Sequence, residues 1–123
     1  MPEPIVRTST PFSARTTTAT QVNIAGTSGN DTLFGDAGED KIYGGMGSDK
    51  IDGGNDGDSI FGEEGNDSLV GSDGDDVVRG GIGDDLLGRL SPTDTVSSES
   101  GNDSLFGDDG KDVIFGGSGD DTI

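Results

Sequence analysis

The amino-acid sequence predicts an all-β solenoid, a fold in which short repeated units stack on one another. Three observations support this prediction: a nine-residue period that runs from Gly26 to Ile123, an aspartate at the sixth position of each unit, and an aliphatic residue at the eighth. One short unit cannot bury its apolar side chain alone, so a fixed period of this kind is typical of stacked repeats. With 123 residues, the chain has room for at most one such domain.

The first 25 residues lie outside the period. They are rich in threonine, serine and proline, which predicts a linker or a frayed N-terminus. They contain no apolar run long enough for a cleaved secretory signal peptide. At the end of this segment we expect a capping strand over 21–25, because Ile24 falls at the eighth position of an earlier unit, although Val22 stands where the aspartate belongs.

Each unit within 26–123 has two parts. Positions one to six are mostly Gly, Asn, Asp and Ser, which favour turns. Positions seven to nine suit a very short strand, in which the middle side chain points away from its two neighbours. We therefore expect position eight in the core and positions seven and nine on the outside. Recurrent glycine makes a helix implausible.

The unit over 89–97, RLSPTDTVS, departs most from the pattern. It loses the turn glycines but keeps Asp94 at position six and Val96 at position eight. We expect a degenerate repeat at 89–97 that keeps its place in the stack, and not an inserted loop. The last repeat, which begins at Gly116, is truncated.

Units such as Gly44-Gly45-Met46-Gly47-Ser48-Asp49-Lys50-Ile51-Asp52 match the pattern G-G-x-G-x-D-x-U-x in full. On these repeats the chain resembles the RTX (repeats-in-toxin), haemolysin-type calcium-binding family. The resemblance implies a parallel β-roll of about eleven units, two per coil, with calcium between turns that stack on the same side. It also implies that position-six aspartates and turn carbonyls hold the calcium. The implied metal ligands are Asp31, Asp40, Asp49, Asp58, Asp67, Asp76, Asp85, Asp103, Asp112 and Asp121.

The chemistry agrees with that implication, because calcium takes six to eight oxygen ligands and two stacked turns offer carboxylates and exposed carbonyls. If the units alternate strictly, one side carries intact turns and the other carries both lesions: Asp56 in place of a position-four glycine, and the Arg89 turn. We expect the gaps beside the Arg89 turn to be weak or empty, which leaves about seven calcium ions.

Composition excludes several classes of protein. The chain has no histidine and no cysteine, which rules out zinc sites of the Cys/His kind and histidine-based acid–base chemistry. A net charge of −18 repels nucleic acid and anionic membranes, and no apolar run could span a bilayer. Low hydrophobicity with high charge is typical of disorder. We therefore expect the metal-free chain to be unfolded and folding to be coupled to calcium.

The same sequence leaves two alternative functions open. We expect no enzyme activity, because every candidate pair of carboxylates belongs to the repeat. The resemblance implies a module of a longer secreted protein, exported by type I secretion, whose neighbouring domain could be a hydrolase, an epimerase or a toxin. A calcium-stabilised adhesive or structural solenoid is the other alternative, although position seven forms no regular threonine array. For the aromatic residues at position nine we expect same-face ladders, such as Tyr43 above Phe61, or a partner surface.

Overall fold

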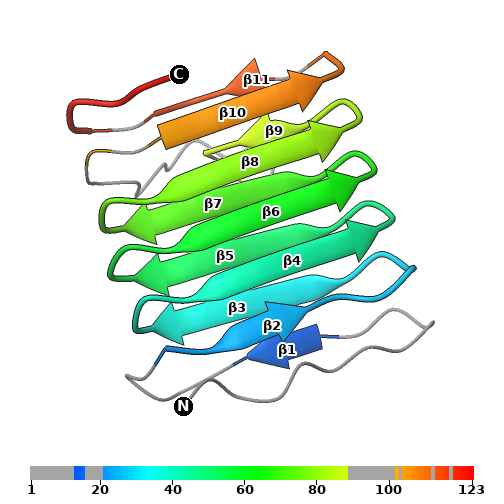
Figure 1. Cartoon of the computed structure of the whole chain (residues 1–123), viewed down its shortest axis with the longest axis horizontal. Coiled ribbons are helices and arrows are strands. Elements are labelled where there is room, and N and C mark those ends of the chain that lie inside the picture. The colour runs from blue at the N-terminus through cyan, green and yellow to red at the C-terminus, as the bar shows by residue number, and fades with distance from the viewer. Residues whose placement is uncertain (1–12, 16–20, 89–101, 103, 112, 117) are drawn as a thin grey trace.

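The computed structural model describes residues 13–15, 21–88, 102, 104–111, 113–116 and 118–123. These residues form a parallel β-solenoid of two sheets that face each other across a narrow core (Figure 1). Within the described residues all regular structure is β-strand, which confirms the predicted fold class. Sheet one contains, in spatial order, β1 (Ser13–Arg15), β3 (Thr32–Ala37), β5 (Lys50–Asn55), β7 (Ser68–Asp73), β9 (Leu86–Leu87) and β11 (Val113–Ile114). Sheet two contains β2 (Asn23–Ala25), β4 (Lys41–Met46), β6 (Ser59–Glu64), β8 (Val77–Ile82) and β10 (Ser104–Asp109).

The strands are longer than the sequence pattern indicates. They begin at position seven but continue through position three of the next unit, so that β3 to β8 each have six residues. The reason is that the glycine-rich positions also pair with the neighbouring coil, as Asp36 does with Gly54 and Ala37 with Asn55. The turns therefore shrink to positions four to six.

The core is one column of aliphatic side chains between the two sheets. Position eight points inward, as predicted, in the described units except the last, whose Ile123 is 72% exposed, and most residues at positions seven and nine are partly or fully exposed. Val70 and Leu86 are buried exceptions. The column consists of Val22, Ile24, Leu33, Ile42, Ile51, Ile60, Leu69, Val78, Leu87 and Leu105, with Ile114 packed against it.

The stacking register changes after Gly88, and this overturns one expectation. From β2 to β9, paired strands are 18 residues apart, which is two units per coil. Val77 of β8, however, pairs with Ser104, and Leu86 of β9 pairs with Val113, so the offset there is 27 residues. The prediction that the alternation continues unbroken past Gly88 is wrong. The unit over 89–97 lies outside the described residues.

A physical reason for the change of register lies in the turn glycines. From the turn at 35–40 onward, positions two and four of the described turns take left-handed φ values that favour glycine, as at Gly45 and Gly47. The segment over 89–92 holds no glycine, and its proline restricts the residue before it. The units that begin at Ser98 and Gly107 keep a glycine at position four. They are therefore the next units able to form a turn that stacks on the preceding coil.

The N-terminal segment differs from a simple linker. Within it, β1 pairs with β3, although nothing in the repeat pattern indicates a strand there. Strand β2 lies in the segment 21–25 and pairs with β4. Val22 is fully buried at the position that holds aspartate in later units. The solenoid thus begins before the first recognisable repeat.

Candidate metal centre

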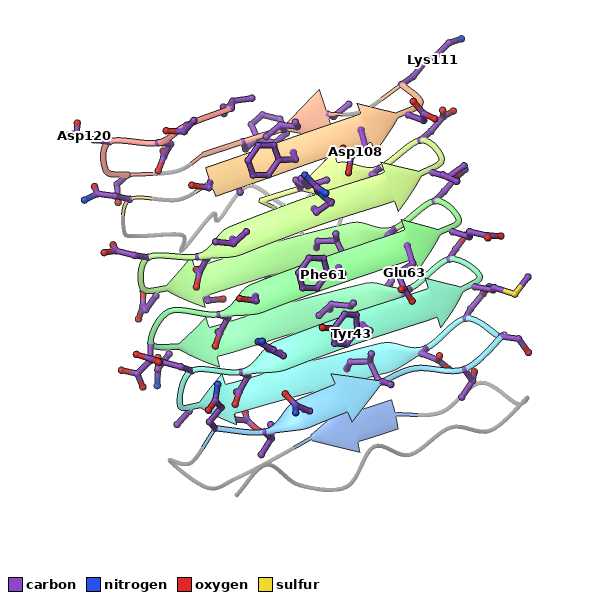
Figure 2. The ribbon with its side chains drawn as sticks, viewed as in Figure 1. Tyr43, Phe61, Glu63, Asp108, Lys111 and Asp120 are labelled. Carbon is purple, nitrogen blue, oxygen red and sulfur yellow. The ribbon has the colours of Figure 1, made fainter. Side chains whose placement is uncertain are left out.

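The turns form two rows, one along each edge of the solenoid (Figure 2). The first row leads from sheet two to sheet one and contains the turns at 29–31, 47–49, 65–67 and 83–85, followed by the turn that holds Lys111. The second row leads from sheet one to sheet two and contains the turns at 38–40, 56–58 and 74–76, the turn that holds Asn102, and the turn at 119–121. Lys111 and Asp120 mark the two opposite edges.

The position-six aspartates form a ladder along each row. In the first row Asp31 N–H donates to Asp49 Oδ1 at 2.8 Å, and Asp49 N–H donates to Asp67 Oδ1 at 2.8 Å. In the second row Asp40 N–H donates to Asp58 Oδ1 at 2.8 Å. From Asp31 to Asp85 all of these aspartates are only 1–2% exposed. From Asp40 to Asp85, one oxygen of each carboxylate therefore accepts an N–H of the preceding coil and ties the two coils together.

The second carboxylate oxygen has no hydrogen-bond partner at four of these aspartates. Oδ2 of Asp40, Asp49, Asp58 and Asp67 is buried and accepts no hydrogen bond. An anionic oxygen taken out of water without a partner is costly unless a cation compensates for the lost hydration. These four oxygen atoms are the clearest indication that the turns bind a cation.

The position-one glycines border the same oxygens. A Cβ added at Gly44 would come closer than 3.0 Å to both Asp49 Oδ2 and the carbonyl oxygen of Gly62. Gly53 and Gly62 stand in the same relation to the aspartate of their own unit and to the carbonyl of the next coil. Glycine at position one thus leaves open the space on which a carboxylate and a carbonyl oxygen converge.

Burial alters the acidity of these carboxyl groups. Desolvation raises the pKa of Asp49 to about 6 and that of Asp58 and Asp67 to about 7, and it also raises the pKa of Asp40. Neighbouring carboxylates add to the effect, while the backbone N–H that each one accepts opposes it. Without a cation, these carboxyls of the folded chain therefore bind protons at a higher pH than an ordinary aspartate does.

The donor set matches calcium better than other metals. Among the described residues, no three Asp, Glu, His or Cys side chains gather closely enough to hold a metal ion by themselves. A cation in a row must therefore be held by carboxylates of successive turns together with backbone carbonyls. Such an all-oxygen set in flexible turns suits calcium, which accepts many oxygens and irregular geometry. The residues present fit this ion.

Eight of the ten predicted ligands belong to the described residues. Asp31, Asp49, Asp67 and Asp85 lie in the first row, and Asp40, Asp58, Asp76 and Asp121 in the second. Asp103 and Asp112 lie outside the described residues. The gap beyond Asp85 resembles the regular ones, because a Cβ at Gly80 would meet Asp85 Oδ2 and the carbonyl of Gly107. Strict alternation placed the Ser98 turn beyond Asp85 and the defective Arg89 turn beyond Asp76. The turn beyond Asp76 instead holds Asn102, whose N–H donates to Asp75 Oδ1, so the expectation that the Arg89 turn stacks there is wrong.

Sequence reasoning missed a second ladder, at position five. Here the side-chain oxygen accepts an N–H from the next coil, as Asn30 Oδ1 does from Ser48 at 2.8 Å and Asn66 Oδ1 from Asp84 at 2.9 Å. The ladder also crosses the register change, where Asp84 Oδ1 accepts from Lys111 at 2.9 Å. The repeated Asn or Asp at position five was the available signal.

The fold and the site together define a β-solenoid with two rows of oxygen-rich turns. The sequence model of the RTX calcium-binding nonapeptide repeat matches residues 25–60, 52–87 and 93–123. The chain therefore belongs to the RTX calcium-binding repeat family, and its repeats bind calcium. No curated protein and no solved structure matches the chain. No helix among the described residues is long and apolar enough to cross a membrane.

Proposed function

We propose that this chain is a calcium-binding module that folds when calcium enters its two rows of turns. The observation that carries the proposal is the buried Oδ2 atom of Asp40, Asp49, Asp58 and Asp67, which accepts no hydrogen bond. A divalent cation between the turns supplies the missing partner and reduces the repulsion that a net charge of −18 creates.

Within each row, the aspartates act through both carboxylate oxygens. Oδ1 accepts the N–H of the preceding coil and fixes the carboxylate, while Oδ2 faces the gap and serves as a calcium ligand with nearby carbonyls. The proposed ligands are Asp40, Asp49, Asp58, Asp67, Asp76, Asp85 and Asp121, together with Asp103 and Asp112 on the sequence pattern. Five stacked turns leave four gaps in each row, eight in all, which is close to the number of about seven bound ions proposed from the sequence.

The wider context of the module is also a proposal. Proteins with repeats of this family are typically secreted, and solenoids of this kind are typically non-catalytic. We infer an extracellular location, export by type I secretion, and a parent protein whose neighbouring domain is a hydrolase, an epimerase or a toxin. The observed register supports no adhesive array, since the pairs at position seven in sheet one read Thr32, Lys50, Ser68 and Leu86.

Circular dichroism on the full chain tests the proposal. Chelator should leave mostly coil, millimolar calcium should produce a β spectrum, and equal magnesium should not, because magnesium gives up its waters reluctantly. Calorimetry should then give the number of ions. At about pH 8, where the carboxyls of Asp49, Asp58 and Asp67 are mostly ionised, a folded chain in chelator or equal folding with magnesium would overturn the proposal.

A further inference from the structure

The turn at the N-terminal end of the first row, residues 26–31, is built differently from the others. At its second position the chain places Thr27, which is only 6% exposed. Thr27 N–H donates to Asp31 Oδ2 at 2.5 Å, and Thr27 Oγ1 lies 3.0 Å from each of the two Asp31 carboxylate oxygens. Gly29 N–H in turn donates to Thr27 Oγ1 at 3.0 Å. The Asp31 carboxylate thus accepts hydrogen bonds from donors within its own turn.

The backbone φ angles of this turn also differ from those of the other turns. In the next coil of the row, Gly45 and Gly47 hold left-handed φ values of 104° and 111° at positions two and four. Neither Thr27 nor Gly29 adopts a left-handed φ. The contrast extends to the aspartates, because Oδ2 of Asp49 accepts no hydrogen bond where Oδ2 of Asp31 accepts one from Thr27. A Cβ at Gly26 would still meet Asp31 Oδ2 and the carbonyl of Gly44, as in the calcium gaps, but this Oδ2 already has a hydrogen-bond partner in its own turn.

We infer that the turn at 26–31 is a metal-independent cap, in which the amide and hydroxyl of Thr27 replace calcium as the partner of Asp31. A carboxylate that accepts hydrogen bonds from an amide and a hydroxyl is stabilised without a cation. Asp31 then contributes no calcium ligand, although it occupies position six. Its N–H still donates to Asp49 Oδ1, so the cap presents a fixed edge to the first calcium-dependent turn.

This inference rests on the proposed calcium binding, and a pair of matched substitutions separates the two. Asp31→Asn and Asp49→Asn both keep an oxygen acceptor at a buried position-six residue of the same row. Calorimetric titration of the full chain with calcium should give the same number of ions for Asp31→Asn as for the parent, and fewer for Asp49→Asn. An equal loss in both variants would overturn the cap. A parent chain that binds no calcium would instead overturn the proposed function.

A second pair of variants tests the role of the hydroxyl. Thr27→Val removes Oγ1 at nearly constant volume, whereas Thr27→Ser retains it. Thr27→Val should raise the calcium concentration at the folding midpoint roughly two-fold without changing the number of ions, because a buried hydrogen bond to a carboxylate is lost. Thr27→Ser should stay near the parent. An unchanged midpoint in Thr27→Val, or a smaller number of ions, would contradict the inference.

Discussion

At the scale of the residue, the position-six aspartates Asp40, Asp49, Asp58 and Asp67 each have two separate tasks. In each, Oδ1 accepts an N–H from the preceding coil, and Oδ2 faces a gap between turns. The hydrogen bond to Oδ1 stabilises the fold, and Oδ2 is available to bind the calcium ion. Substitution by asparagine therefore tends to keep the hydrogen bond and weaken calcium binding, whereas alanine removes both.

The acidity of these groups predicts how the calcium-free chain responds to pH. The pKa of Asp49 is raised to about 6, and that of Asp58 and Asp67 to about 7, from an ordinary value of 3.8. A carboxyl with a higher pKa in the folded chain binds its proton more tightly there, so protonation favours folding. This stability is fully present below about pH 4 and is lost as the pH rises through about 6 to 7.

In chelator, the β signal in circular dichroism should thus be stronger at about pH 4 than at about pH 8. Asp58→Asn should reduce this acid-induced gain, because it removes one of the buried carboxyls. Glu64→Gln, at an exposed carboxylate, should leave the gain unchanged. Equal effects of the two variants would show that overall charge, and not burial, controls the response. With calcium present the trend should reverse, since calcium requires the ionised ligand.

At the scale of the element, the turns depend on left-handed backbone at positions two and four. Among the residues that the structure describes, five other than glycine hold such φ values, from 69° to 80°: Asp36, Asp56, Glu63, Ser72 and Asp108. Asp56 is the one of these at position four, where the turns at 47–49, 65–67 and 83–85 all have glycine. An L-residue other than glycine in this region costs about 1–2 kcal/mol, so these positions store strain.

Asp56→Gly should therefore relieve about 1 kcal/mol of backbone strain in the calcium-bound chain. Part of this gain is offset by the loss of the hydrogen bond that Gly38 N–H donates to Asp56 Oδ2 at 3.2 Å. The calcium midpoint, followed by circular dichroism, should fall. The reverse change, Gly47→Ala, should raise it, because φ is 111° and the new Cβ would meet the carbonyl of Gly29. A higher midpoint for Asp56→Gly would contradict the assignment of strain to this turn.

The same positions show why the sequence predicts some elements and not others. Position eight was predictable, because alternation within a strand decides which of three neighbouring side chains faces the core. The extension of each strand through positions one to three was not, because glycine there indicates a turn until the neighbouring coil offers hydrogen-bond partners, as Gly54 does for Asp36. The position-five ladder likewise exists only between coils.

At the scale of the whole molecule, side-chain contacts on the outer face of sheet two stabilise the changed register, in addition to the packing of the core. On the outer face of sheet two, Tyr43 stacks on Phe61 with ring centroids 5.0 Å apart, as predicted (Figure 2). Arg79 continues this ladder: its guanidinium lies 5.1 Å from the centroid of the Phe106 ring, and Arg79 Nε lies 3.2 Å from Asp108 Oδ2. Both partners belong to β10, 27 residues or more along the chain. Unbroken alternation would have placed Ser97 beside Arg79.

Engineered disulfides distinguish the two registers directly, because the chain has no cysteine of its own. Val77 pairs with Ser104, and neighbouring residues on paired strands lie within reach of a disulfide. Val77→Cys with Ser104→Cys should therefore cross-link in calcium under mild oxidant, as judged by mobility on a non-reducing gel. Val77→Cys with Thr95→Cys, the pair that unbroken alternation would join, should not. Cross-linking of the second pair alone would refute the observed register.

The offset of 27 residues also bears on how chains of this type gain and lose repeats. Beyond the register change, Asn102 of the unit that begins at Ser98 lies in the second row, although strict alternation would put that unit in the first. Its Leu105 is still 1% exposed in the common core. A unit is therefore interchangeable between the two edges. The number of repeats in such a gene therefore need not change by whole coils of two units. Insertion or deletion of an odd number of nine-codon repeats moves every later repeat to the opposite edge and leaves the aliphatic column continuous.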